Sequence, residues 1–318
     1  MKRLLLTLLL LSCAIGTNAQ ELFAYRDSVK EGYNFLLYLP PGADTCTAPL
    51  PTVLFLHGKS LCGTDLNDVM RYGTIDAVKR GLQLNAVVIA PQTEEVGWIA
   101  EKLERTADFV TRKFPCDSNR FYVVGMSMGG WGTLKMVHRY PDKIAAALAM
   151  CGGYAESSTS GLADVPLWII HGFLDTVTVV SYSATLVKKL YDTGQGTRLI
   201  YDQPACGHSE LARVFYLPEL YDWLFKHNLQ DPGRPVNLGY SFSEQKMNAA
   251  YGRLDPDKAL DLVARRPRYV PDRAPEPEPE PEITSWDEIP PLTDWERPLL
   301  LRLRERWLSS RLQPGGGL

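Results

Sequence analysis

One serine of this sequence lies in a short segment that could make its hydroxyl a nucleophile. Residues 125–130 read Gly-Met-Ser-Met-Gly-Gly, directly after the apolar run Phe121–Val124 and before a helical pattern. A tight turn between a strand and a helix strains the backbone of the serine and leaves no room for large neighbours. It lifts the hydroxyl clear of the sheet and turns the next amide toward a reacting carbonyl. We therefore predict Ser127 as nucleophile and the amide of Met128 as an oxyanion donor; a purely structural glycine turn is the alternative.

A serine hydroxyl needs a base that takes its proton. In folds with this strand-turn-helix motif, which is called the nucleophile elbow, the acid and then the histidine follow the serine along the chain. His208 and His227 come late enough. His208 lies in Ala-Cys-Gly-His-Ser, just after the last expected strand, whereas His227 ends a helical pattern and is expected to be solvated. We predict His208 as the base.

The third member of such a site is an acid that fixes the imidazole tautomer and offsets its charge. Asp175 follows the apolar run Leu167–Ile170 with a short loop between, which favours it. Asp202 comes only six positions before His208 and is expected on a surface loop, and Asp164 precedes its strand.

A second oxyanion donor is expected from the loop that follows the third strand, residues 56–63. The backbone amide of Lys59 is the prediction. Ser60 is the reserve donor and an expected substrate-pocket residue, and an ordinary glycine turn is the alternative for this loop.

Apolar runs and helical patterns alternate from about residue 20 to residue 228, which predicts a doubly wound α/β domain. The first two strands alternate apolar and polar residues, as in an antiparallel edge hairpin. The later ones are continuous apolar runs, as in a parallel sheet covered by helices on both faces. The eight expected strands are 22–26, 33–39, 52–57, 86–90, 120–125, 145–150, 167–171 and 197–201, and helices are expected at 99–114, 130–139, 180–193 and 209–225.

Beyond Asn228 the composition changes. Residues 274–282 alternate proline and glutamate, which predicts an extended spacer, because proline lacks the amide donor and the acids repel. A short helix is expected near 257–265. Residues 298–311 have a helical pattern with one apolar face, which favours docking onto the main domain; binding to a membrane surface or a partner is the alternative.

The N-terminus has the layout of a secretory signal peptide. Lys2 and Arg3 precede an apolar run, and small residues lead to Ala19, where cleavage is expected. The protein is therefore expected to be exported, periplasmic or secreted. Lipid anchoring at Cys13 is the alternative, because residues 10–13 loosely match a lipoprotein cleavage box. The expected organisation is a signal peptide at 1–19, a catalytic domain at 20–230, an extension at 231–273, a linker at 274–283 and a helical tail at 284–318.

Composition limits the classes of partner. The formal net charge of −3 gives no surplus of cations for nucleic acid. The cysteines left after signal cleavage are odd in number, so at least one thiol stays unpaired. No Cys-x-x-Cys or His-x-x-x-His spacing occurs, so a structural zinc site is not expected. Membrane contact is expected only through a lipid at Cys13 or through the C-terminal helix.

Several motifs occur together in an order that resembles the dienelactone hydrolase and phospholipase/carboxylesterase branch of the α/β-hydrolases, including secreted bacterial esterases related to feruloyl and acetyl esterases. They are Val53–Gly58 with the loop that follows, Ala90-Pro91-Gln92 with Trp98, Gly125–Gly130, His171-Gly172-x-x-Asp175 and Gly207-His208. The resemblance covers roughly residues 30–228.

That resemblance implies the α/β-hydrolase fold, with a mostly parallel eight-stranded sheet, and a cofactor-free Ser-His-Asp esterase with a small cap. It implies small-molecule esters of small alcohols, sugars or acyl chains as substrates and places Trp98 at the active-site cleft, although a buried core tryptophan is the alternative. The residues at 59–62 depart from the family pattern, which puts the second oxyanion donor in doubt. We expect a serine hydrolase that cleaves carboxylic esters through an acyl-enzyme. The alternatives are a peptidase of the same fold and a catalytically silent binding protein.

Overall fold

The protein is described by a computed structural model for residues 21–43, 46, 48–240 and 243–254. The predicted signal peptide, the Cys13 lipid site, the short helix near 257–265, the Pro-Glu linker and the C-terminal helix lie outside the described residues.

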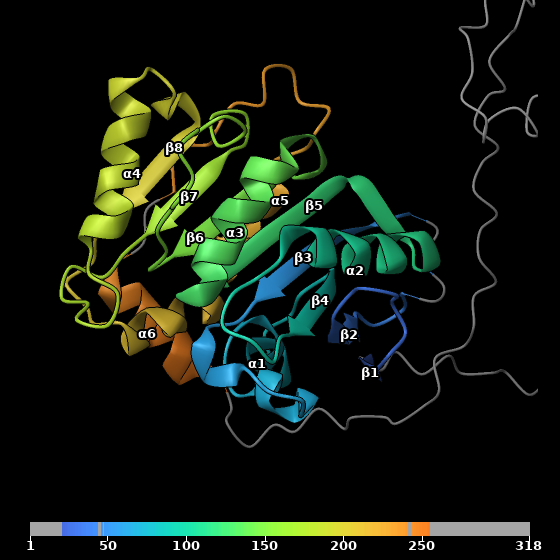
Figure 1. The fold of residues 1–318 in the computed structure, drawn as a ribbon. Coiled ribbons are helices and arrows are strands. Elements are labelled where there is room, and N and C mark those ends of the chain that lie inside the picture. The colour runs from blue at the N-terminus through green and yellow to red at the C-terminus, as the bar shows by residue number, and fades with distance from the viewer. Residues whose placement is uncertain (1–20, 44–45, 47, 241–242, 255–318) are drawn as a thin grey trace, which may run out of the picture. The chain divides into compact units, whose positions relative to one another are not determined.

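The described chain is built on one eight-stranded sheet in the order β1-β2-β4-β3-β5-β6-β7-β8 (Figure 1). β1 and β2 pair antiparallel, β2 is also antiparallel to β4, and all later neighbours are parallel. The predicted sheet is confirmed, with strand ends shifted by at most four residues. The strands are β1 (Glu21–Tyr25), β2 (Asn34–Leu39), β3 (Leu50–Leu56), β4 (Val87–Gln92), β5 (Cys116–Met126), β6 (Ala146–Met150), β7 (Leu167–Ile170) and β8 (Leu199–Asp202).

Helices cover both faces of the sheet, so alternate residues of each central strand enter two separate cores. One core contains side chains from α2, α3 and α4, and the other contains side chains from α1, α5 and α6. Both faces of the central strands are therefore dry, which explains their continuous apolar sequences. The α-helices are α1 (Thr74–Lys79), α2 (Ala100–Lys113), α3 (Met128–Arg139), α4 (Ser181–Asp192), α5 (Pro218–Phe225) and α6 (Glu244–Arg253).

The single helix predicted over 209–225 is wrong. The chain forms a 3-10 helix at Ser209–Tyr216, breaks at Leu217, and starts α5 at Pro218. Leu217 is extended, with φ −82° and ψ 118°. The proline ring disfavours helical backbone at the preceding residue, and its missing N–H suits the first position of a new helix.

The packed domain continues beyond the predicted boundary at residue 230. Arg234 donates a 3.0 Å hydrogen bond to the carbonyl of Pro141. In α6, Met247 and Ala250 are buried in the same core as the 3-10 helix at Ser209–Tyr216. Arg234 and α6 therefore belong to the packed domain. Their polar, proline-rich sequence gives no indication of this packing.

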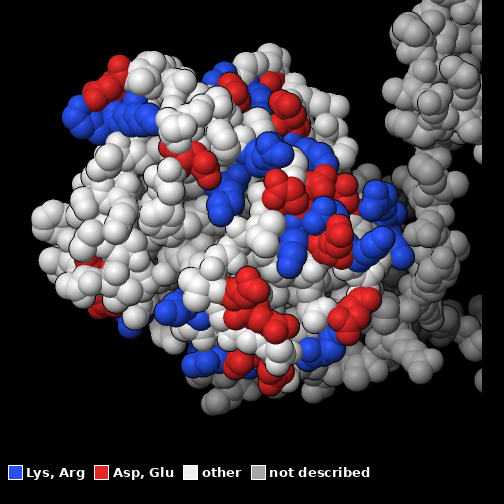
Figure 2. All heavy atoms as spheres, viewed as in Figure 1, with Lys and Arg blue, Asp and Glu red and all other residues white. Residues whose placement is uncertain are grey.

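Charged side chains on the face seen in Figure 2 mix in sign over α2 and α3. Arg139 pairs with Glu101 at 3.3 Å, and Lys143 pairs with Asp108 at 3.5 Å. The positive and negative charges on this face are therefore interspersed and do not form a patch of one sign. Within the described part of the chain, none of the helices combines the length and the apolar composition needed to cross a bilayer.

Candidate active site

Ser127 lies at a sharp turn between β5 and α3, at the carboxyl edge of the parallel strands. Its backbone has φ 58° and ψ −124°, a conformation that side-chain-bearing residues rarely adopt. The amide of Ser127 donates to the carbonyl of Met150 at 2.8 Å, which ties the turn to β6. The turn also needs glycine at position 129, because a Cβ there would lie 1.9 Å from the carbonyl oxygen of Leu56. The strain predicted for the elbow is present.

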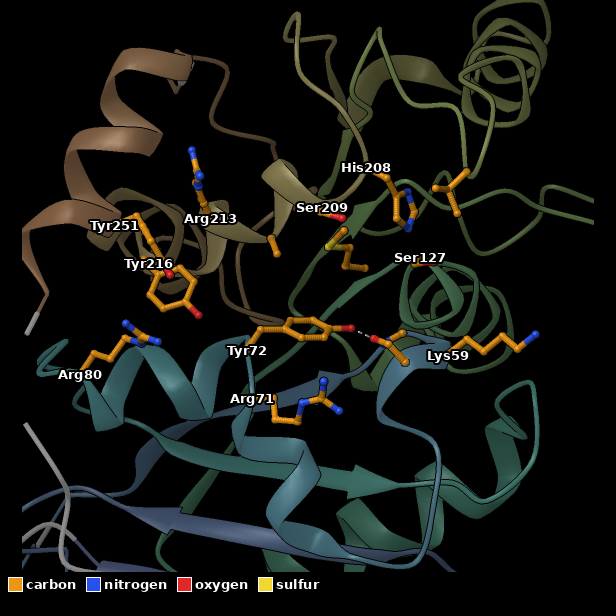
Figure 3. Close-up of a pocket in the computed structure, with 15 residues that line it drawn as sticks. Lys59, Arg71, Tyr72, Arg80, Ser127, His208, Ser209, Arg213, Tyr216 and Tyr251 are labelled. Atoms are coloured by element: carbon orange, nitrogen blue, oxygen red, sulfur yellow. Dashed lines mark hydrogen bonds between the residues drawn. The ribbon is translucent and has the colours of Figure 1, made fainter. Parts of the chain in front are cut away.

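His208 lies on the loop after β8, immediately before the 3-10 helix. Its side chain is 13% exposed, and its Nδ1 is 2.6 Å from Oδ2 of Asp175. His208 and Ser127 line the same cleft, with the imidazole directed toward the serine (Figure 3). Because Nδ1–H donates to the carboxylate, Nε2 of the neutral ring carries a free lone pair that can accept the serine proton.

The carboxylate of Asp175 is fully buried and held by several donors. Its Oδ1 accepts from the amides of Val177 and Thr178 at 2.8 and 2.9 Å. Burial alone would raise the pKa of Asp175, but the hydrogen bonds from His208, from these amides and from Cys151 outweigh it and lower the pKa. Asp175 therefore stays ionised at neutral pH and fixes the tautomer of His208.

The two predicted oxyanion donors each begin a helix. Lys59 starts a 3-10 helix at Lys59–Leu61, and Met128 starts α3. The first amides of a helix have no acceptor within it, so both are available for a ligand oxygen. The amide of Gly58, in contrast, donates to the hydroxyl of Tyr72 at 2.7 Å. Lys59 and the reserve candidate Ser60 both line the cleft that contains Ser127.

Tyr72 is a site residue that the sequence reasoning missed. Its hydroxyl lies beside the loop that carries Lys59 and fixes that loop through Gly58 (Figure 3). No motif marks this tyrosine, since it comes from a short irregular segment between a 3-10 helix and α1. The contact exists only because the fold brings the two loops together.

Trp98 lines a cleft and supports the loop that leads to Lys59. It is 2% exposed and lines a second cleft next to Ser127. Its indole N–H donates to the carbonyl of His57 at 3.2 Å, and its ring lies edge-on to the imidazole of His57, with centroids 4.8 Å apart. The indole therefore anchors the residue that leads into Gly58 and Lys59.

Another serine and histidine pair, Ser183 and His171, shares Asp175 with His208. Ser183 is 2.8 Å from Nδ1 of His171, and Nε2 of His171 is 2.7 Å from the carbonyl of Thr178 and 3.5 Å from Asp175. Burial lowers the pKa of His171, so its ring is neutral. Ser183 and His171 are fully buried and line neither cleft next to Ser127. This pair braces the Asp175 loop and is closed to substrate.

Two residues that the sequence analysis rejected as catalytic candidates lie in surroundings that differ from the expected ones. His227 was expected to be solvated, and this is wrong, since it is 2% exposed and packs against Trp223. Asp202 ends β8 instead of lying on a surface loop, and its carboxylate accepts from Trp168 at 2.7 Å. The Asp202 carboxylate therefore bonds to Trp168, whereas His208 bonds to Asp175.

The five cysteines among the described residues are all free thiols: Cys46, Cys62, Cys116, Cys151 and Cys206. Cys151 lies with His171 and Asp175 in a buried group whose ligand atoms are within 4.8 Å of one another. Burial and the adjoining Asp175 raise the pKa of the Cys151 thiol, so it stays protonated and donates to the carboxylate. The group therefore orients Asp175, whereas a metal would need the thiolate.

Two clefts open on either side of Ser127. The larger, of about 750 Å³, is lined by His208 and is named the His208 cleft. The smaller, of about 510 Å³, is lined by Trp131 and is named the Trp131 cleft. Ser127, Lys59 and Val177 line both, so the nucleophile lies where the two clefts meet.

Known proteins with similar sequences or structures include several hydrolases. The chain is 29% identical over 255 residues to an S-formylglutathione hydrolase of Bos taurus, covering 64% of this chain and 86% of that protein. A solved thermostable esterase is 25% identical with a TM-score of 0.53, covering 66% of this chain and 63% of that one. A solved ferulic acid esterase is 14% identical with a TM-score of 0.53, covering 65% and 98%. No protein-family model matches the sequence.

The sheet order and these structural likenesses decide the fold. The chain has the α/β-hydrolase fold. The order of elements agrees with it, because Ser127 follows β5, Asp175 follows β7 and His208 follows β8. The α/β-hydrolase elbow, the acid loop and the histidine loop all leave the carboxyl ends of parallel strands, which places the three side chains at one edge of the sheet.

Proposed function

We propose that the protein is a carboxylic ester hydrolase that works through Ser127, His208 and Asp175. One observation carries the proposal: a strained serine faces an imidazole whose other nitrogen is bound, at 2.6 Å, to a buried carboxylate. The similar hydrolases support the same reaction class. The clefts beside Ser127 have the volumes of small-molecule sites, which favours a small ester as substrate.

In this mechanism His208 takes the proton of Ser127 through Nε2 while the serine oxygen attacks the ester carbonyl. The amides of Met128 and Lys59 stabilise the oxyanion that develops. The ionised Asp175 stabilises the imidazolium without taking its proton. His208 then protonates the leaving alcohol, and the acyl group stays on Ser127. Water activated by His208 releases the acid in the second half of the reaction.

The test is hydrolysis of p-nitrophenyl acetate and butyrate by the purified protein and by Ser127→Ala. The wild type should turn over these esters and the variant should lose the activity. Ser183→Ala is the matched control, because Ser183 also hydrogen-bonds a histidine but is closed to substrate. Loss of activity in a folded Ser183→Ala protein, with activity kept in Ser127→Ala, would reverse the assignment.

Two further assays, labelling with a fluorophosphonate probe and hydrolysis of anilides, separate the alternatives. A folded protein that hydrolyses neither ester, and whose Ser127 does not react with a fluorophosphonate probe, would be a binding protein. Turnover of anilide substrates at rates that match the esters would indicate a peptidase instead.

We also propose that the protein is exported. The basic start at Lys2 and Arg3, the apolar run and the small residues up to Ala19 support cleavage by a signal peptidase. Expression in a bacterial host with mass spectrometry of the processed protein tests this. A mature N-terminus at Gln20 supports it, a lipid on Cys13 supports the anchored form, and an intact N-terminus on a cytoplasmic product would contradict export.

A further inference from the structure

The two clefts beside Ser127 differ in charge. The His208 cleft is lined by four cationic side chains (Lys59, Arg71, Arg80 and Arg213) and, among the described residues that line it, by no aspartate or glutamate. The Trp131 cleft shares Lys59 with the His208 cleft and adds one cation and one acid, Lys135 and Glu156, among mainly aromatic and small side chains. One side of the nucleophile is therefore basic and the other is largely apolar.

The leaving alcohol belongs on the basic side. In ester hydrolysis the imidazole protonates the departing oxygen, so the alcohol must lie beside His208. His208 lines the larger cleft and is absent from the lining of the smaller one. The acyl group then extends into the Trp131 cleft, whose aromatic lining suits an apolar chain.

The arginines of the His208 cleft are only partly neutralised. Arg80 pairs with Asp76 at 2.6 Å, and that carboxylate also accepts from Tyr216 at 2.6 Å. Arg71 reaches Asp68 only at 3.8 Å, and its side chain is 64% exposed. A guanidinium group that is only partly paired with a carboxylate can still donate hydrogen bonds to an anion. Its two parallel N–H groups suit two oxygens of a carboxylate or phosphate.

Arg213 is held in place by neutral groups. Its guanidinium donates to Asn248 at 2.5 Å and lies 5.3 Å from the ring centre of Tyr251. Arg80 lies 5.5 Å from the same ring, so Tyr251 separates two cations (Figure 3). The nearby Glu210 accepts from the amide of Gly207. Helix α6 supplies Tyr251 and Asn248, so the segment beyond residue 230 helps to build this side of the cleft.

We propose that the His208 cleft binds an alcohol that carries a negative charge, so that the preferred substrates are esters of carboxylated or phosphorylated alcohols. Arg71 and Arg213 would receive the anion, and Tyr72, Tyr216 and Tyr251 would contact the carbon skeleton. The proposal rests on the hydrolytic function proposed above and adds the substrate class of the same site.

The test compares three acetate esters of similar size at low ionic strength: the neutral 2-methoxyethyl acetate, the carboxylate 3-acetoxypropanoate and 2-acetoxyethyl phosphate. The measured quantity is the rate of acetate release. We expect kcat/KM for at least one charged ester to exceed that for the neutral ester by about tenfold or more, the effect of one charge-assisted hydrogen bond. The charged ester with the higher kcat/KM shows whether the cleft prefers a carboxylate or a phosphate. The preference should shrink as the salt concentration rises.

Arg71→Gln and Arg213→Gln should each reduce the ratio of charged to neutral kcat/KM, and the double variant should remove most of it. Arg139→Gln on α3 is the matched control, because this arginine pairs with Glu101 and lines neither cleft. It should keep the wild-type ratio. A wild type that prefers the neutral ester, or ratios equally insensitive to all three variants, would overturn the proposal.

Failure of the proposed function has a different signature. Hydrolysis of the neutral ester without any charge preference contradicts only the anionic leaving group. Absence of hydrolysis of all three esters, together with absence of fluorophosphonate labelling at Ser127, would contradict the hydrolase function and with it this substrate class.

Discussion

Replacement of Asp175 by asparagine tests the catalytic geometry without a change of side-chain size. Oδ1 of Asp175 accepts from two backbone amides, and Oδ2 accepts from His208. In the variant the amide oxygen must take the Oδ1 position, because only an acceptor satisfies two N–H groups. The amide nitrogen then faces Nδ1 of His208, which must give up its proton and carry it on Nε2. That tautomer cannot accept the proton of Ser127.

Two effects add up in this variant. Restoring the productive tautomer breaks the amide contacts, which costs about 2–3 kcal/mol, and the imidazolium loses its charged partner, which costs about the same again. A total of about 4–6 kcal/mol corresponds to a loss of about 10³- to 10⁴-fold in kcat.

The assay is kcat on p-nitrophenyl acetate, with thermal unfolding to show that the variant is folded. Asp202→Asn is the matched control, because the Asp202 carboxylate accepts from the indole of Trp168 and burial raises its pKa, so an amide is a close substitute. We expect this control to stay within about twofold of the wild type, because an amide oxygen can still accept the Trp168 hydrogen bond. A folded Asp175→Asn enzyme within tenfold of the wild type would refute the role given to Asp175.

Three further changes probe the supporting structure. Tyr72→Phe removes the acceptor for the Gly58 amide and should lower kcat several-fold with little change in KM, measured on the same ester; an unchanged kcat would contradict the positioning role. Gly129→Ala places a Cβ 1.9 Å from the Leu56 carbonyl and should abolish activity and lower the melting temperature; an active, equally stable variant would show that the elbow can relax. Burial lowers the pKa of His57 from 6.5 to about 4, so the folded state binds fewer protons than the unfolded state between these values, and the free energy of unfolding should fall by up to about 3 kcal/mol as the pH drops through that window. Imidazole NMR should show His57 still neutral near pH 5, and a protonated ring there would contradict this burial effect.

The sheet and Ser127 could be predicted because their signals are local. Continuous apolar runs mark strands buried on both faces, and the Gly-x-Ser-x-Gly turn leaves no room for other residue types at position 129. Asp175 and His208 follow from the order of loops after β7 and β8. The structure places both beside each other as the sequence order predicts.

The remaining features depend on contacts between distant segments. Tyr72 acts through Gly58, and Tyr251 reaches the cleft from a helix that the sequence assigned to an extension. The buried state of His227 depends on Trp223, one turn earlier in the helical region, and on the segment at residue 237. The contacts of Tyr72 with Gly58 and of residue 237 with His227 join separate segments of the chain, so they follow no periodic pattern that sequence reasoning could detect.

The central claim is that the hydroxyl of Ser127 is the nucleophile. The most direct measurement is tandem mass spectrometry of the protein after reaction with a fluorophosphonate, which forms a stable covalent bond with an activated serine. A single adduct on Ser127, absent after pre-incubation with a slowly hydrolysed ester and lost in His208→Ala, is the predicted result. An adduct on another serine, or an unlabelled Ser127 in a protein that hydrolyses esters, would contradict the claim.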